Sequence, residues 1–144
     1  MHGDSFRTYV RWRRGGGLTR FRKKDAPRNG QIVELAKDML EMADGLGLSR
    51  FSLIGHDWGA RAAYIASVLA PGRIAGSVAL SVGWGTNAPD QTMSYRQMQN
   101  YRYHWPIGLD RGADLIRNDR LRFMRYIWSL WNMVWEMPAE EFAA

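Results

Sequence analysis

A single aspartate stands between two glycines in Gly55-His56-Asp57-Trp58-Gly59, directly after a short apolar run. A carboxylate is ionised at neutral pH, so it can attack a carbon bearing a leaving group without a base to activate it. The product of such an attack is an alkyl ester of the enzyme, and its removal requires a histidine that activates water. The pattern makes Asp57 a candidate nucleophile towards epoxides or carbon–halogen bonds.

The residues around Asp57 predict a sharp turn from a strand into a helix. Phe51 to Ile54 has the length of a buried strand, and Ala60 to Ala70 is an alanine-rich helical segment. Such a turn needs small residues two positions from its apex, which Gly55 and Gly59 provide. The apex then lies at a helix N-terminus, where free amides stabilise negative charge, and the amide of Trp58 can donate to an oxyanion.

A purely structural role explains the same turn. Aspartate is a favoured N-cap residue, because its carboxylate accepts hydrogen bonds from the first free amides of a helix. The pattern glycine–x–aspartate–x–glycine is also short enough to occur by chance. Both interpretations of Asp57, nucleophile and helix cap, are open on the local sequence alone.

Further segments predict the scaffold that positions this turn. Phe6 to Trp12 and Ile74 to Val82 have the composition of strands, and apolar residues follow helical spacing from Gln31 to Leu46. Strands and helices alternate with short links, which favours right-handed crossovers and a parallel sheet of about three strands. The predicted fold class is α/β.

Beyond Val82 the composition changes to a polar loop and then to helical segments dense in aromatic residues. Within them a helical stripe is formed by Phe123, Ile127, Leu130 and Val134. Such a stripe is more typical of a core or a domain contact than of a membrane-surface helix. No apolar stretch approaches the ~20 residues that span a bilayer.

The composition is that of a globular protein, with 46% hydrophobic and 24% charged residues. It excludes wholesale disorder and a collagen. The chain has no cysteine, which excludes disulfides and thiolate metal sites and is compatible with a reducing cytoplasm. We expect a cytoplasmic protein with no cofactor and no metal.

The net charge of +6 comes from one segment. Arg7 to Lys24 holds eight of the 20 basic residues and no acid, whereas 14 acids outnumber the other twelve bases. A basic cluster can bind nucleic acid or anionic lipid, and a basic binding module is an alternative function. Because charge runs are usually solvated and no recognition helix follows this one, we expect neither nucleic acid nor a membrane as partner.

The turn and its flanks resemble one enzyme superfamily. Gly55-His56-Asp57-Trp58-Gly59 resembles the nucleophile elbow of the α/β-hydrolases, in the branch of epoxide hydrolases and haloalkane dehalogenases. The resemblance covers roughly residues 6 to 144. Its other motifs are Arg14-Gly15-Gly16-Gly17-Leu18-Thr19, with Gly16 at the family's aromatic position, Leu35 to Leu40, Ala43 to Leu48, Pro71-Gly72-Arg73-Ile74 and Gly85 to Gly112.

The resemblance implies a partial α/β-hydrolase core over residues 1–85 and part of a helical cap over residues 86–144. Asp57 would be the nucleophile, and Trp58 would supply an oxyanion-hole amide and, in a dehalogenase, an indole for the halide. Tyr103, with Tyr101 close by, lies near the cap tyrosine that donates a hydrogen bond to the epoxide oxygen. The implied partner is a small-molecule substrate: an epoxide, a haloalkane or an ester.

The family's late acid and histidine have no counterpart in this sequence. In the family they follow the cap, whereas this chain ends at Ala144 within what resembles the cap. His2, His56 and His104 do not fit the position of the missing histidine. We therefore expect an internal fragment of a hydrolase, inactive alone; a non-catalytic interaction protein that keeps the turn as scaffold is the other interpretation, and the sequence leaves the oligomeric state open.

Overall fold

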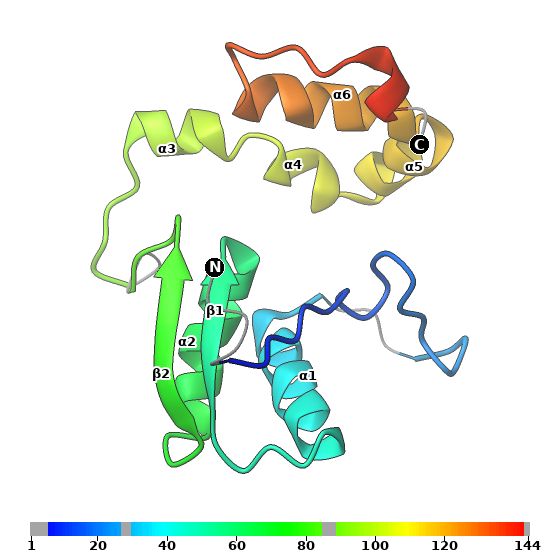
Figure 1. The fold of residues 1–144 in the computed structure, drawn as a ribbon. Helices are drawn as coiled ribbons and strands as arrows, with labels where there is room; N and C mark the ends of the chain where they lie inside the picture. The colour runs from blue at the N-terminus through cyan, green and yellow to red at the C-terminus, as the bar shows by residue number, and fades with distance from the viewer. Residues whose placement is uncertain (1–5, 27–29, 85–88, 143–144) are drawn as a thin grey trace. The chain divides into compact units, whose positions relative to one another are not determined.

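The computed structural model of the chain describes residues 6–26, 30–84 and 89–142. The chain divides into two compact units, Met1–Ala88 and Pro89–Ala144, and each is described by itself (Figure 1). The assignment of a hydrolase core to residues 1–85 and of a cap to residues 86–144 stays a prediction.

The first unit is built on two parallel strands. β1 (Phe51–His56) pairs with β2 (Ile74–Leu80), and α2 (Trp58–Leu69) makes the crossover between them (Figure 1). α1 (Ile32–Gly45) precedes β1 and packs against α2. Parallel pairing through a helical crossover confirms the predicted α/β class, although the described sheet has two strands rather than about three.

Alanines make the contact between the helices and the sheet. Ala36 of α1 and Ala62 and Ala66 of α2 are almost completely buried against one another, and Leu53 of β1 packs on them. Because alanine projects a single methyl group, helix and sheet backbones can approach closely. Among the described residues, the buried apolar side chains are six alanines and Ile127.

The other face of the two-stranded sheet carries apolar side chains that the described residues leave uncovered. Ile54 lies opposite Val78, and His56 lies opposite Leu80. Ile54 is 75% exposed, and Val78 and Leu80 are each about half exposed. A parallel sheet is usually covered on both faces, whereas this face of the sheet leaves apolar side chains in water.

The expected strand at Phe6 to Trp12 is wrong. These residues have irregular backbone without a strand ladder, and Val10 is 94% exposed. β-branched and aromatic residues favour a pleated surface only where a neighbouring strand offers backbone partners. Here the segment is held instead by its arginine side chains.

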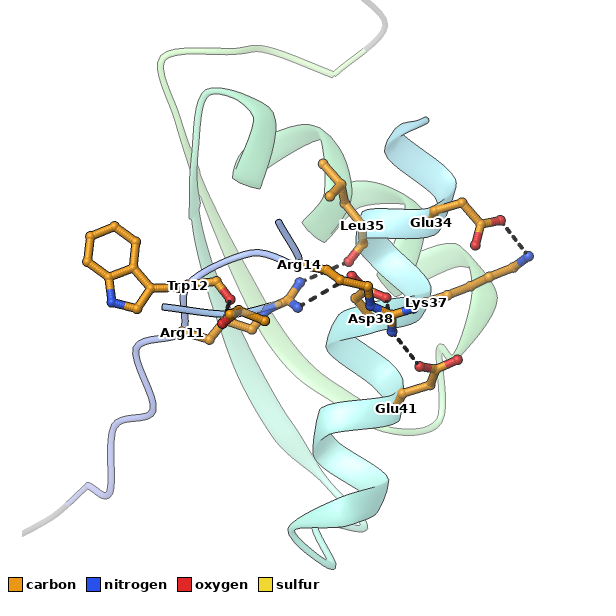
Figure 2. A network of polar contacts seen from close by, with 9 residues as sticks. Arg11, Trp12, Arg14, Glu34, Leu35, Lys37, Asp38 and Glu41 are labelled. Atoms are coloured by element: carbon orange, nitrogen blue, oxygen red, sulfur yellow. Dashed lines mark hydrogen bonds and ion pairs between the residues drawn. The ribbon is translucent and has the colours of Figure 1, made fainter. Parts of the chain in front are cut away.

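Two arginines tie this N-terminal segment to the acidic face of α1 (Figure 2). Nη2 of Arg11 donates to the carbonyl of Leu35 at 3.0 Å, and Nη2 of Arg14 lies 2.6 Å from Oδ1 of Asp38 and 3.1 Å from Oε2 of Glu41. The Asp38 side chain is only 11% exposed and also faces Arg11 at 4.0 Å. Burial lowers the pKa of the Arg11 guanidinium, while the Asp38 carboxylate raises it. Part of the basic cluster is therefore used within the fold.

A glycine-rich turn follows the anchored arginines. Gly17 has a φ of +52°, and a Cβ there would overlap the ring of Trp12. The hydroxyl of Thr19 donates to the Trp12 carbonyl at 3.0 Å, which closes the turn. Glycine is required here both by the backbone conformation and by the indole that fills the place of its side chain.

The second unit is helical. Its elements are α3 (Tyr95–Asn100), α4 (His104–Ile107), α5 (Asp110–Asn118), α6 (Arg120–Trp131) and a 3₁₀ turn, η1 (Ala139–Phe142). Ser94 and Gln97 form a capping box at the start of α3, and Asp119 caps α6 by accepting from the amide of Arg122 at 3.1 Å. No described helix is long and apolar enough to cross a membrane.

The predicted aromatic and apolar stripe is confirmed over three of its four positions. Ile127 is buried, and Phe123 and Leu130 are half-buried. Val134 is fully exposed, because α6 ends at Trp131 and the chain leaves the helix at Asn132. The hydrophobic period thus continued beyond the helix itself.

Asp38→Asn should release the N-terminal segment from α1. The change keeps the side-chain shape but removes the charge that faces Arg11 and Arg14, an interaction worth about 1 kcal/mol for a partly screened ion pair. We expect trypsin to cleave after Arg11, Arg13 and Arg14 about fivefold faster, measured by limited proteolysis and mass spectrometry. Glu34→Gln is the control, because it breaks the exposed Lys37–Glu34 pair on the same helix. Equal acceleration by both variants would contradict the anchoring role.

Candidate active site

The turn between β1 and α2 contains one residue, Asp57. β1 ends at His56 and α2 begins at Trp58, so the expected strand–turn–helix is confirmed. Asp57 has φ +53° and ψ −113°, a conformation that costs a non-glycine residue about 1–3 kcal/mol. Its amide donates to the carbonyl of Leu80 in β2 at 3.1 Å, and its carbonyl accepts from the amide of Arg61 at 3.2 Å. The backbone of Asp57 is held from both sides.

Gly55 lets the strand and the helix cross at this point. A Cβ at Gly55 would overlap the carbonyl of Gly59 and would lie 2.7 Å from the amide nitrogen of Ala60. A Cβ at Gly59, in contrast, would meet no described atom within 4 Å. The prediction that both positions need a small residue is therefore correct for Gly55, where a Cβ has no room, and wrong for Gly59, where it has room.

The side chain of Asp57 is exposed and makes no capping hydrogen bond to the helix that follows it. The helix-cap interpretation is therefore not supported by the structure. Asp57 directly precedes the N-terminal, positive end of the α2 dipole, where the first-turn amides have no acceptor within the helix. Trp58 supplies the first of these amides, and its own side chain is 40% exposed. An accessible anion beside backbone donors is an arrangement that suits nucleophilic attack.

The end of β2 contributes contacts that sequence reasoning missed. Ser81 directly follows β2 with a φ of +68°, a second non-glycine residue in the left-handed region. The hydroxyl of Tyr64 in α2 donates to the Val82 carbonyl at 2.9 Å, and the Tyr64 ring meets Trp84 edge-on at 5.2 Å. A lone phenol in an alanine-rich helix was the available signal for Tyr64; nothing in the sequence marks Ser81.

Tyr103 belongs to the second unit, whereas Asp57 and Trp58 belong to the first. The half-buried Tyr103 ring packs edge-on against Trp131 at 5.4 Å and against His104 at 4.4 Å. Tyr101 also stacks on His104, at 5.4 Å between ring centroids. Both tyrosines are thus parts of an aromatic cluster, and a role of Tyr103 at an epoxide bound to Asp57 stays a prediction.

The two described histidines lie in different units. His56 is exposed on β1, opposite Leu80, and His104 lies in the aromatic cluster of the second unit. His2 lies outside the described residues. In the described part of the chain, no group of three or more His, Asp or Glu residues could hold a metal ion.

A shallow hollow of about 450 Å³ lies at the opposite end of the strands from Asp57. It is lined by residues before β1 and β2, among them Asp44, Leu48 and Arg73. Arg73 donates to the Leu48 carbonyl at 2.8 Å and pairs with Asp44 at 2.7 Å. These contacts join the residues that precede β1 to the residue that precedes β2. We therefore assign the side chains around the hollow a structural role.

No family model matches the chain, but individual proteins do. Epoxide hydrolase B of Mycobacterium tuberculosis is 36% identical over 83 residues, which are 57% of this chain and 22% of that protein. A putative epoxide hydrolase from Klebsiella pneumoniae superposes with a TM-score of 0.77 and 29% identity over 91% of this chain and 44% of its own. A second one, from Pseudomonas aeruginosa with bound MFA, gives a TM-score of 0.62 and 26% identity over 80% and 40%.

The chain thus has epoxide hydrolase homologues by sequence and by structure, and the resemblance predicted from the sequence is confirmed. The match spans about a fifth of the curated relative and less than half of each solved structure. The homologues support a hydrolase.

Gly55→Ala should destabilise the first unit. The added methyl has no room against the Gly59 backbone, and overpacking of this kind costs about 1–3 kcal/mol. Chemical denaturation followed by circular dichroism measures the change in the free energy of unfolding. Gly59→Ala is the matched control and should be neutral or stabilising, because its methyl meets open space within a helix. Equal losses would show that strand–helix contact does not set the requirement.

Asp57→Gly and Asp57→Ala should differ in the reverse of the usual order. Both remove the carboxylate, but only glycine adopts φ +53° and ψ −113° without strain. We expect the glycine variant to be more stable than the alanine variant by about 1 kcal/mol, once its greater flexibility in the unfolded chain is included. Denaturation midpoints of the two variants check this. An alanine variant of equal or higher stability would mean that Asp57 is not strained.

Proposed function

We propose that this chain carries the nucleophile half of an epoxide-hydrolase-like hydrolase, with the Asp57 turn acting as a nucleophile elbow. The observation that carries the proposal is the exposed, uncapped carboxylate of Asp57 on a left-handed backbone at the start of α2. The names of the homologues favour an epoxide over a haloalkane or an ester as the electrophile.

In the proposed reaction, a carboxylate oxygen of Asp57 attacks one epoxide carbon. The bond from that carbon to the epoxide oxygen breaks, and the oxygen keeps the electron pair of this bond. The oxygen stays attached to the other epoxide carbon as an alkoxide. A hydroxyl donor must protonate this oxygen, which is the role proposed for Tyr103. The product is a hydroxyalkyl ester on Asp57.

Hydrolysis of the ester would use the other groups of the turn. Water attacks the ester carbonyl, and negative charge develops on the carbonyl oxygen of Asp57. The Trp58 amide is proposed to donate to this oxyanion, assisted by the N-terminal end of the α2 dipole. The attacking water must lose a proton to a base, normally a histidine oriented by an acid. Collapse of the intermediate then breaks the bond from the Asp57 carbonyl carbon to the alkyl oxygen, and the alkoxide takes up that proton and leaves as the diol.

We further propose that this base and its acid are supplied by polypeptide that is not part of this chain. The two described histidines are on the open strand face and in the aromatic cluster, as given above. The solved homologues are more than twice as long as the part that this chain matches. The chain alone should then form the ester and stop.

A small aryl epoxide, styrene oxide, tests the nucleophile. Intact-mass and peptide analysis should find one epoxide mass added to Asp57 per chain. Asp57→Asn should form the adduct at least tenfold more slowly, because an amide is a poor nucleophile, while asparagine still tolerates a positive φ. Asp114→Asn is the control, since Asp114 is an exposed carboxylate paired with Arg117 on α5.

Each outcome is decisive for one part of the proposal. A folded chain that never acquires an adduct, or that is labelled equally at Asp57 and Asp114, contradicts the nucleophile. Sustained diol release over many turnovers contradicts the proposal that the base lies outside this chain.

A further inference from the structure

The segment that follows β2, Ser81 to Trp84, is fastened to the helix that begins at the Asp57 turn. We call this segment the β2 exit. Its contacts are not used by the proposed reaction. These contacts are nevertheless linked to the backbone of Asp57 through a hydrogen bond to the last residue of β2.

The first contact joins the end of β2 to the turn. The amide of Asp57 donates to the Leu80 carbonyl at 3.1 Å. Leu80 is the last residue of β2, so the place of its carbonyl depends on the path that the chain takes next. That path begins at Ser81 with φ +68°, a conformation that a non-glycine residue keeps only where neighbouring contacts fix it.

The second set of contacts fixes that path from α2. The Tyr64 hydroxyl donates to the Val82 carbonyl at 2.9 Å, one residue beyond Ser81. The Tyr64 ring meets the Trp84 ring at 5.2 Å and 80°, a favourable edge-to-face arrangement. Tyr64 is therefore bonded to the residue after Ser81 and packed against the last described residue of the β2 exit.

These contacts form a closed circuit. From Asp57 it runs through the Leu80 carbonyl to Ser81 and Val82, then through the Tyr64 hydroxyl into α2, and back along α2 to Asp57. Both left-handed non-glycine residues of the described chain, Asp57 and Ser81, lie within it. Loosening one link frees the neighbouring backbone to relax towards ordinary dihedral angles.

We infer that Tyr64 is a positioning residue for Asp57: it holds the β2 exit so that the Leu80 carbonyl stays in place to accept the Asp57 amide. The inference rests on the proposed function only where it concerns the chemistry of Asp57. The structural part concerns one hydrogen bond at the turn and can be tested without any substrate.

Amide hydrogen exchange, followed by NMR on the 144-residue chain, measures that hydrogen bond directly. Tyr64→Phe keeps the ring but removes the hydroxyl that bonds Val82. We expect the Asp57 amide to exchange about three- to tenfold faster, the change typical of losing one net hydrogen bond. The Phe51 amide, which donates to the Arg73 carbonyl at 3.0 Å at the other end of β1, should change less than twofold.

Ser67→Ala is the matched control on the same helix. The Ser67 hydroxyl donates to the Ala63 carbonyl within α2 at 2.8 Å and does not touch the β2 exit. It should leave the Asp57 amide unchanged. Tyr64→Leu removes the ring as well, so it should accelerate exchange at Asp57 further and shift the indole resonance of Trp84, which Tyr64→Phe should leave in place.

Several results would overturn the inference. Equal acceleration at Phe51 and Asp57, or unfolding of Tyr64→Phe, would show a general structural role for Tyr64. So would acceleration at Asp57 by Ser67→Ala. No change at Asp57 in Tyr64→Phe, or an Asp57 amide that is unprotected in the parent chain, would show that the circuit does not hold the turn.

The chemical consequence is measured separately. If Asp57 alkylates with styrene oxide, Tyr64→Phe should slow the reaction, whereas Ser67→Ala should leave its rate unchanged. A chain that forms no adduct contradicts the proposed function but leaves the exchange result for Tyr64 intact. Normal alkylation together with faster exchange at Asp57 would limit the role of Tyr64 to the backbone and overturn its positioning role in the reaction.

Discussion

The close approach of two backbones at Gly55 is the constraint on which the candidate site depends. A Cβ at Gly55 would overlap the Gly59 carbonyl. Because glycine carries only a hydrogen there, the helix can follow the strand after a single residue. That residue, Asp57, must then take a left-handed conformation, and its side chain is left exposed rather than folded back as a helix cap. The alanines that bury α2 against Leu53 and α1 serve the same end, since larger side chains would push strand and helix apart.

The charge of the arginine-rich segment suggests a binding surface, but in the structure two of its arginines make contacts within the fold. Arg14 is bonded to Glu41, 27 residues further on, and Arg11 to the carbonyl of Leu35, 24 residues further on. The acidic side of α1, which in the sequence resembles an ordinary solvated helix face, is the partner of these two side chains. The charge that the sequence counts as an excess is therefore balanced locally in part, which weakens the case for a nucleic-acid or lipid surface built on the whole segment.

The sequence predicts correctly the elements whose signals lie within a few neighbouring residues. The prediction fails where an element depends on contacts with a segment that is distant in the sequence. The period of the segment after Gln31 and the glycines around Asp57 predict α1 and the strand–helix turn, because each is determined within a few residues. Phe6 to Trp12 has strand composition but irregular backbone, since a strand also needs an edge to pair with. Nothing in the sequence marks Ser81, and a lone phenol marks Tyr64 without showing its role, because both roles arise where β2, α2 and the turn meet in space.

The same distinction separates the two halves of the proposed chemistry. Everything that the proposed alkylation needs from the turn, a carboxylate held on strained backbone, comes from the contiguous stretch between Phe51 and Val82. That stretch is stabilised by its own crossover, by Gly55 and by the Tyr64 contact. A water-activating base has no such local origin, because it must face the ester from another part of the polypeptide. In the proposed mechanism, ester formation and ester hydrolysis are therefore physically separable steps.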